Sequence, residues 1–549
     1  MIISEFEYQK NTFFDSISYG KAVIFDPNSK HKYLLKKQTN NLINQIQSDI
    51  LEYFNTVYKV NWEQLTSLYS DSSIEAVQSL FWEPYFNNIM VNIRKKNKIS
   101  FLELYDMCIV KAKDRFSGDV FKSYISQEAF NQAEKILLDH DANIKTLIKR
   151  RLFQFLISRY KKPIIVIIDE FHEEYFYQLS EVVKGIIIRK VDDYNLIVDY
   201  AYNFQIPMVK TDIEIKKHDF VIIDNIKEEV FINPDKKTFQ LYKHTCDNII
   251  FSKNEIAKYQ MKQLKLYIPL VDTRYLNILE NESFYAGVGI FKTEYFFMTR
   301  GLLPSNDELT NIFVQLMNTF KNREINVSIP DFGENKRLNY YLETATSIIN
   351  IHGYTMVFNI FFDSLFEAIL KTNKKIALVI PMMRNGDDIT LWKEKINYLF
   401  KKLPKELMPY IVGFLQTDNS IDQIEDFVKS DFNILDLDTY IEETSLSYGR
   451  YDEMAWIDFK TEQLPYVLDA HQHMRRNGIR MKHLIGGNVL RKKFIFQKLI
   501  NSGFTHFIIP LSSIRLGEEI VSNHERTRGR FIGVSQKRRM EKASIKSLN

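Results

Sequence analysis

The sequence predicts an α/β protein with a small mixed sheet in its N-terminal half and a closed (β/α)₈ barrel in its C-terminal half. Short β-branched runs separated by turn residues occupy residues 162–237, which is typical of a small mixed sheet. After Lys265, apolar segments alternate with helical spacers, which indicates a parallel sheet. Residues 33–160 instead repeat apolar side chains at helical spacing and predict a helical insert.

The number of apolar segments decides between two parallel architectures. Eight of them follow one another after Lys265, and eight parallel strands favour a closed barrel over a doubly wound sheet, which stays open as the alternative. In chain order the eight segments are KLYIPLV, AGVGIF, INVSIP, KIALVIP, PYIVGFL, FNILDL, IRMKHLI and THFIIPL.

The changes of pattern along the chain predict five parts. A small α/β domain is formed by 1–32 and 148–240, and the helical insert interrupts it at 33–147. A linker helix is expected at 241–262, the barrel at 263–525 and a basic tail at 526–549.

Composition excludes several classes of protein. Hydrophobic residues make up 45% and charged residues 26% of the 549-residue chain, which are globular values and not those of a disordered protein. Two cysteines cannot build a disulfide framework, so a reducing, cytoplasmic setting is expected. The N-terminus lacks the pattern of a secretory signal, and no apolar run reaches the roughly 18 to 20 residues of a membrane helix.

Charge is unevenly distributed. Residues 526–549 contain eight Lys or Arg and one acid, so this tail carries +7. The net charge of the whole chain is +4, which leaves −3 for residues 1–525. A basic tail on an acidic body is either a solvated end or a contact for a polyanion such as nucleic acid, an anionic membrane surface or an acidic protein.

Barrels of this class carry their chemistry where the strands end, at the C-terminal face. Several polar side chains follow the predicted strands there and form a candidate ligand site. They are Lys292, Glu294, Ser328, Asp331, Gln416, Asp436, Asp438, His483 and Ser512.

The segment GVGIFKTEYFFMTRGLLP (287–304) resembles the motif G-[VI]-G-L-[FY]-R-T-E-F-L-[FY]-M of phosphoenolpyruvate-utilising enzymes, and within that group enzyme I of the bacterial sugar phosphotransferase system. Further resemblances occur in the family's order. SISYGKA (16–22) resembles its first strand, and DFVIIDNIKEEVFINP (219–234) resembles the end of its phosphohistidine domain. VSIPDFGENK (327–336) and VIPMM (379–383) resemble two further barrel motifs.

The resemblance implies a swivelling phosphohistidine domain whose helical insert docks the carrier protein HPr. It also implies a barrel that binds phosphoenolpyruvate and Mg²⁺ and forms a homodimer. Family enzymes move a phosphoryl group from phosphoenolpyruvate to a histidine and then to HPr. These properties are expectations for this chain.

The phosphorylated histidine of the family is absent from its expected position. It lies eleven residues before the proline of a Leu-Pro pair in the family, and Ile206-Pro207 places that position at Leu196 here. No histidine occurs between His172 and His218. Leucine has no nucleophilic nitrogen that could accept a phosphoryl group.

Barrel positions depart from the family as well. Lys292 replaces an arginine that grips phosphate at two points, and Ser328 replaces a second one. Gln416 stands for the metal-ligand glutamate and Gly486 for the proton-donating cysteine. The ligand-binding candidates are therefore Lys292, Ser328, Asp331 and Lys336, and the weak metal candidates are Asp436 and Asp438.

These losses predict a degenerate, non-catalytic relative of enzyme I that acts in regulation or in binding a protein or ligand. No cofactor is expected, although Mg²⁺ stays possible if the barrel mouth still functions. An HPr-like carrier, a second copy of the chain through the barrel, and a polyanion at the tail are the expected partners. An active phosphotransferase or another barrel enzyme with altered residues, and a polyanion-binding protein, are the alternatives.

Overall fold

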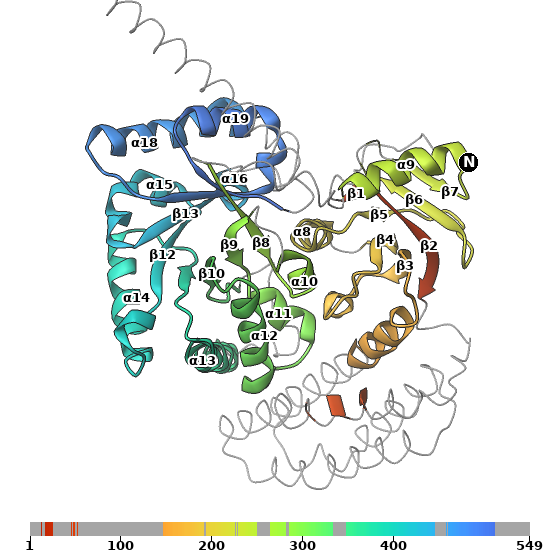
Figure 1. Ribbon diagram of the computed structural model, residues 1–549, viewed down its shortest axis with the longest axis horizontal. Coiled ribbons are helices and arrows are strands. Elements are labelled where there is room, and N and C mark those ends of the chain that lie inside the picture. Colours follow the sequence, from red (N-terminus) through yellow and green to blue (C-terminus); the bar gives the residue numbers. More distant parts are fainter. Residues whose placement is uncertain are drawn as a thin grey trace, which may run out of the picture.

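The structure is a computed structural model in which a seven-stranded mixed sheet lies beside a closed eight-stranded barrel (Figure 1). It describes residues 12–13, 17–25, 45–46, 48–49, 52, 146–191, 194–225, 227, 229–249, 264–280, 285–332, 347–444, 457 and 459–510. Most of the predicted helical insert and the basic tail lie outside these residues, and the domain boundaries therefore stay predictions.

The mixed sheet has the strand order β1-β5-β4-β3-β2-β6-β7. Strands β2 to β5 run parallel, whereas β6, β7 and β1 are antiparallel to their neighbours. The short β-branched runs predicted as strands are confirmed. The bounds are β1 (Thr12–Phe13), β2 (Ile17–Phe25), β3 (Ile164–Glu170), β4 (Val183–Lys190), β5 (Met208–Lys210), β6 (Phe220–Asp224) and β7 (Glu229–Ile232).

Helical segments flank this sheet. Residues 146–157 are helical, and the 3₁₀ helix η3 (Glu173–Phe176) follows β3. Helix α8 (Tyr194–Phe204) connects β4 to β5 and faces the barrel (Figure 1). Helix α9 (Lys236–Ile249) packs on β2, so a helix begins before the predicted linker position of 241.

The barrel closes in the order β8 to β15, which confirms the predicted (β/α)₈ barrel and excludes the doubly wound alternative. All eight predicted apolar segments supply a strand. The bounds are β8 (Lys265–Leu270), β9 (Tyr285–Phe291), β10 (Glu324–Ser328), β11 (Ala377–Ile380), β12 (Tyr410–Leu415), β13 (Phe432–Asp436), β14 (His483–Gly486) and β15 (His506–Ile508).

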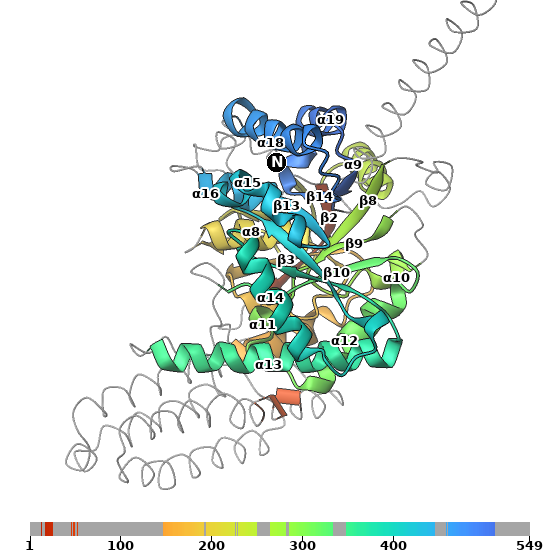
Figure 2. The ribbon, with the colours of Figure 1, turned by 90° about the vertical axis from the view of Figure 1, so that its left-hand side faces the viewer.

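Helices surround the barrel strands (Figure 2). Their bounds are α10 (Leu276–Leu279), α11 (Glu294–Arg300), α12 (Asn306–Thr319), α13 (Ser347–Thr372), α14 (Gly386–Leu399), α15 (Asp418–Asp422), α16 (Leu437–Thr444), α18 (Leu464–Arg476) and α19 (Lys493–Asn501). Polar side chains start several of them: Ser305 accepts a hydrogen bond from the Glu308 amide, and Asn385 caps α14 in the same way. Among the described residues, no helix combines the length and apolar character needed to cross a bilayer.

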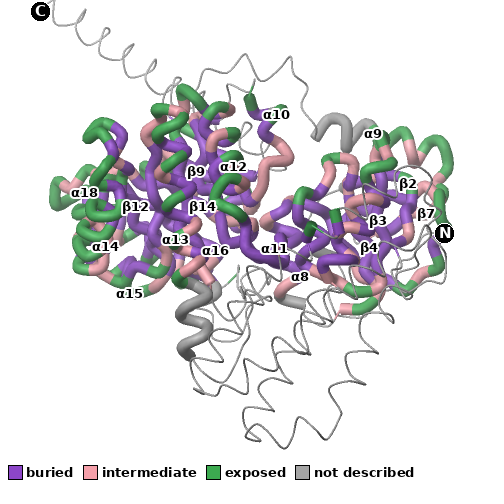
Figure 3. Tube along the Cα trace, turned by 90° about the horizontal axis from the view of Figure 1, so that it is seen from below, coloured by how far each residue is buried: buried purple, intermediate pink, exposed green. Residues whose placement is uncertain are grey.

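One apolar core continues from the barrel into the mixed sheet. Buried side chains of α8 and η3 belong to the same cluster as those of β8, β9 and α11. Figure 3 shows this continuity as an unbroken buried region between the two parts. The barrel interior holds a second cluster, which includes Tyr267, Phe414 and Ile508. The barrel is therefore filled by side chains, and ligands can reach it only at its ends.

Close strand approach makes one barrel glycine a sensitive position. A Cβ added at Gly287 of β9 would overlap the Glu324 carbonyl oxygen and lie 2.8 Å from its carbonyl carbon. We expect Gly287→Ala to lower stability by about 1–3 kcal/mol, because a backbone neighbour cannot move aside as a flexible side chain can. Chemical denaturation of the full chain measures this loss.

Gly486→Ala is the matched control in β14. Its added Cβ would meet its nearest neighbour at 3.5 Å, an ordinary van der Waals contact. Equal losses for the two variants would contradict the role assigned to the β9–β10 approach.

Candidate functional site

The C-terminal face of the barrel brings together four of the predicted site residues. Lys292 follows β9, Asp436 ends β13 and Gly486 ends β14, and all three line one cavity together with Asp438. The cavity measures about 60 Å³, well below the roughly 300–1,000 Å³ of common ligand pockets. Helix α8 contributes Tyr202 and Asn203 to its wall, and Gln205 just after the helix also lines it.

Ser328 and Gln416 lie outside the lining of this cavity. The Ser328 hydroxyl donates to the Ile329 carbonyl oxygen at 3.0 Å, and the Ser328 carbonyl accepts from Thr293 at 2.7 Å. The side-chain oxygen Oε1 of Gln416 accepts a hydrogen bond from the backbone amide of Met382 at 2.9 Å. Met382 has a φ of 53°, a rare conformation for a side chain of this size, so the Gln416 contact stabilises a strained turn.

The other ligand candidates are not gathered at the cavity. Asp331 is half-buried just beyond β10 and does not line it. Lys336 lies outside the described residues. Of the three described members of the predicted ligand set, Lys292 lines this cavity, and Ser328 and Asp331 do not.

The two metal candidates occupy different elements. Asp436 ends β13, whereas Asp438 lies in the first turn of α16 and not on the same strand. The strand is shorter than the apolar pattern indicated because α16 begins immediately at Leu437.

Both carboxylates are engaged by neighbouring groups. Asp438 accepts from the Asn488 amide at 2.7 Å, from the Asn488 side chain at 3.0 Å and from the Val489 amide at 3.3 Å. Asp436 accepts from the Thr439 hydroxyl at 2.8 Å and from the Asp438 amide at 3.2 Å. Within the described ranges no group of three or more His, Cys, Asp or Glu could hold a metal ion. These hydrogen bonds use carboxylate oxygen atoms that a Mg²⁺ ion would need as ligands.

Helix α8 contacts Lys292 through one side chain. The Asn203 amide oxygen accepts from the Lys292 ammonium at 3.1 Å, and the Asn203 amide nitrogen donates to the Tyr295 hydroxyl at 2.7 Å. Tyr295 in turn donates to the buried Asp199 carboxylate, one turn earlier in α8. The cation at the barrel mouth is therefore already hydrogen-bonded by the neighbouring α/β part.

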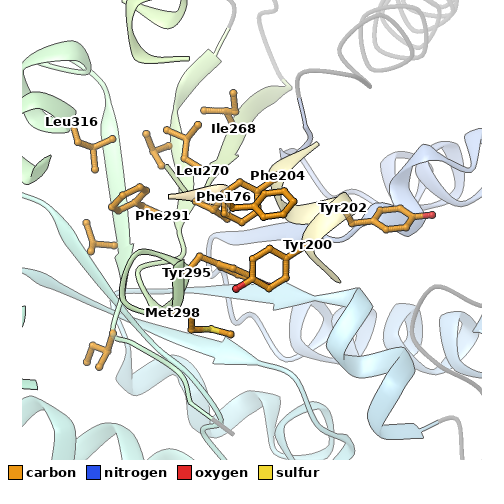
Figure 4. Close-up of a cluster of buried hydrophobic side chains, with 14 of the residues drawn as sticks. Phe176, Tyr200, Tyr202, Phe204, Ile268, Leu270, Phe291, Tyr295, Met298 and Leu316 are labelled. Atoms are coloured by element: carbon orange, nitrogen blue, oxygen red, sulfur yellow. The ribbon is translucent and has the colours of Figure 1, made fainter. Parts of the chain in front are cut away.

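Aromatic packing holds α8 in this position. Tyr200 and Phe204 place their rings 5.5 and 5.8 Å from that of Tyr295 (Figure 4). Such edge-to-face pairs contribute about 0.5–1.5 kcal/mol each beyond their buried area. Arg274, from the loop after β8, stacks over Phe204 at 5.3 Å and donates to its carbonyl oxygen at 2.9 Å.

Leu196 lies on the same face of α8 as Asp199 and Asn203, because these residues are three and seven positions apart. Its side chain is half-buried and packs against the shared core, and it does not line the mouth cavity. The Asp199–Asn203 pair was missed from the sequence. Its signal in the sequence was two polar residues four apart, close to Leu196.

A buried ionic cluster joins the same two parts at a second place. Arg300 of α11 pairs with Glu308 at 2.5 Å and with Glu52 at 3.1 Å. Arg150 pairs with Asp49 at 2.7 Å and donates to the Arg300 carbonyl oxygen. Removing one partner of a buried pair costs about 3–5 kcal/mol, because the other charge is left uncompensated.

Glu174 of η3 lies at the edge of this cluster. A Cβ placed at Gly301, which has a φ of 71°, would lie 3.0 Å from its Cγ. Burial raises the pKa of the Glu174 carboxyl to about 7, against the opposing influence of Arg150 and Lys149. The structure buries both Glu173 and Glu174, although they end the polar segment DEFHEE (169–174).

Comparison with known proteins agrees with this architecture. Residues 253–414 match the family model described as PEP-utilising enzyme, PEP-binding domain. The phosphoenolpyruvate-protein phosphotransferase of Buchnera aphidicola subsp. Schizaphis graminum (strain Sg) is 24% identical over 215 residues, which are 35% of this chain and 36% of that protein. Multiphosphoryl transfer protein 2 of Escherichia coli (strain K12) is 23% identical over 268 residues, 45% of this chain and 32% of that protein.

The matched segments thus span about a third of the length of these relatives. An NMR structure of Enzyme I is matched over 44% of this chain and 99% of that one, at 14% identity, with a TM-score of 0.22 that is too low to support an inference. The sequence matches thus show distant similarity to phosphoenolpyruvate-protein phosphotransferases, and residues 253–414 are similar to the PEP-binding domain of PEP-utilising enzymes.

We expect Asp438→Ala to lower stability by about 1.5–3 kcal/mol, because three donors from Asn488 and Val489 lose a charged acceptor. The loss should be the same with and without Mg²⁺. Denaturation with and without Mg²⁺ measures both quantities. A loss that appears only with Mg²⁺ present would identify Asp438 as a metal ligand instead.

Glu174→Gln should stabilise the protein at pH 8 and leave its stability unchanged near pH 4. The folded-state pKa of about 7 lies above the ordinary 4.5, so the folded state binds more protons between these values. Wild-type stability therefore falls as pH rises through this window, by at most about 3 kcal/mol, and the neutral Gln variant escapes this loss.

Thermal unfolding of both proteins from pH 4 to 8 measures the difference. Glu170→Gln is the control, since Glu170 is exposed at the end of β3. A pH-independent difference between wild type and Glu174→Gln would show that Glu174 is not protonated in the folded protein.

Proposed function

We propose that this chain is an enzyme I-like protein that acts by binding a ligand or partner and does not transfer phosphoryl groups from phosphoenolpyruvate through a histidine. In this proposal the protein has a regulatory function, which it performs by binding that ligand or partner. The supporting observation is the contact of α8 with the barrel mouth, where Asn203 hydrogen-bonds Lys292. The sequence resemblance assigns the position of the family's nucleophile to Leu196, in the same helix.

Phosphotransfer needs a nucleophile that reaches the donor and positive charge that stabilises the transferred group. Helix α8 supplies no nitrogen base, because it contains no histidine. Lys292 retains a positive charge at the mouth but is hydrogen-bonded to Asn203. A cavity of about 60 Å³ leaves room for only a few water molecules.

The degenerate barrel positions have structural partners that support the same conclusion. Ser328 bonds within its own strand end, and Gln416 stabilises the Met382 turn. Gly486 carries no side chain that could donate a proton. The contacts of Ser328 and Gln416 require no reaction.

An enzyme with altered chemistry is the second candidate, because Lys292 and Asp436 line the same cavity. In that case the residues that hold a substrate would be these two with Asp438, and Mg²⁺ would bind beside Asp436. Cytoplasmic location, a homodimer through the barrel, an HPr-like carrier and a polyanion at the basic tail remain part of the proposal, on the resemblance and the charge distribution.

Incubation with labelled phosphoenolpyruvate and Mg²⁺ tests the proposal. We expect no acid-labile phosphohistidine, because α8 provides no acceptor and Asn203 already hydrogen-bonds Lys292. An active enzyme I assayed in parallel serves as the positive control. Stoichiometric label on this chain would overturn the proposal.

Leu196→His is the matched variant. It restores an imidazole at the expected position, and we expect it to stay unlabelled because the barrel residues around Lys292 are also altered. Label on Leu196→His alone would mean that the barrel is still competent and that the nucleophile is the one essential loss.

A further inference from the structure

A larger cavity lies at the opposite end of the barrel from the mouth. It is formed where β14 begins at His483 and β15 begins at His506, beside the C-terminal end of α18. Its volume is about 300 Å³, which reaches the range of ligand pockets and exceeds the 60 Å³ of the mouth. Neither the resemblance to enzyme I nor the proposed function assigns a role to this end.

Positive charge surrounds the entrance of this cavity. Arg475, Arg480 and Lys482 line it, and none of its described lining residues is acidic. Lys482 is neutralised by Glu324, whose carboxylate is 2.5 Å away. Arg475 and Arg480 are exposed and have no carboxylate partner within the described part of the chain, so two guanidinium groups stay available to a ligand.

The floor of the cavity is made of imidazole rings. His471 and His483 are 8% and 7% exposed, and their ring centroids are 5.8 Å apart. His471 also stacks on Phe504 with a centroid distance of 3.9 Å, which fixes the plane of its ring. Its Nδ1 atom is buried and has no hydrogen-bond partner among the described residues. A buried polar atom without a partner is costly, and a ligand that contacts it would remove this cost.

These imidazoles are uncharged at neutral pH. Burial lowers the pKa of His471 to about 4 and that of His483 to about 3, with Arg475 adding to the effect at His471. Burial and the nearby Lys482 and Lys265 lower the pKa of His506 to about 4. A neutral imidazole carries one N–H donor. The floor thus provides hydrogen-bond donors below a positively charged rim.

This combination selects against cations and in favour of oxyanions. A metal ion would meet two guanidinium groups at the entrance, and the described residues contain no metal-binding group of three. Arginine forks match carboxylate and phosphate oxygens at two points each. A neutral apolar ligand would leave both the arginines and His471 Nδ1 without a partner.

We propose that this cavity binds a small oxyanion with two negative charges, either a phosphate or a dicarboxylate, between Arg475 and Arg480 at the rim and His471 and His483 on the floor. The site is separate from the barrel mouth and does not depend on Lys292. Both ligand types carry two negative charges and present pairs of oxygen atoms that an arginine can bind at two points.

Titration calorimetry of the full chain with inorganic phosphate and, separately, with succinate tests the proposal. We expect saturable binding of at least one of them, and the preferred ion identifies the ligand type. Arg475→Gln and Arg480→Gln should each weaken this binding at least tenfold. Both side chains are exposed, so the variants should fold normally.

Arg476→Gln is the matched control, because Arg476 is exposed on the same helix and does not line the cavity. The Arg476→Gln variant should bind the anion with the same affinity as the wild type. In a second measurement, the ring-proton resonances of His471 and His483 should shift on binding in wild type and not in Arg475→Gln.

Two outcomes would overturn the proposal. One is the absence of saturable binding of phosphate and of succinate. The other is binding that survives in both arginine variants but is lost in Lys292→Ala, which would place the anion at the mouth. Neither outcome depends on the phosphoenolpyruvate labelling experiment, so this site and the proposed function can fail independently.

Discussion

The contact between α8 and the barrel mouth determines what the rest of the structure can do. Asn203 bridges Lys292 and Tyr295, and the rings of Tyr200 and Phe204 seal the same surface. This one contact supplies part of the wall of the mouth cavity, engages its cation and joins the apolar cores of the two parts. The family resemblance implies a domain that swivels. In this structure the corresponding α/β part packs against the barrel through α8.

The buried ionic cluster also holds the α/β part against the barrel, at a second place in their interface. Arg300 and Glu308 belong to the barrel, Arg150 to the helix before β3, and Asp49 and Glu52 to the described part of the segment between β2 and β3. Moving the α/β part away would separate charges that have few solvent contacts. Salt bridges of this kind specify one arrangement more than they add net stability.

The sequence was informative where one physical rule acted alone. Continuous apolar strands alternating with helices predicted the barrel, because a parallel sheet buried on both faces needs such strands. The residues at strand ends were also predicted, since strand direction places Lys292, Asp436 and Gly486 at one face. The use of those residues could not be predicted. Gln416 supports a strained turn and Asp438 accepts hydrogen bonds from Asn488 and Val489, and such partners come from segments far along the chain.

The shared core also makes substitutions in the two parts depend on each other. A substitution at Tyr295 changes the surface on which Tyr200 and Phe204 of α8 pack. A tolerated substitution on either surface must therefore still fit the other. A barrel separated from its α/β partner would expose these aromatic rings to water and would tend to associate through them. The packing of these rings therefore constrains both parts together, whatever chemistry the barrel mouth performs.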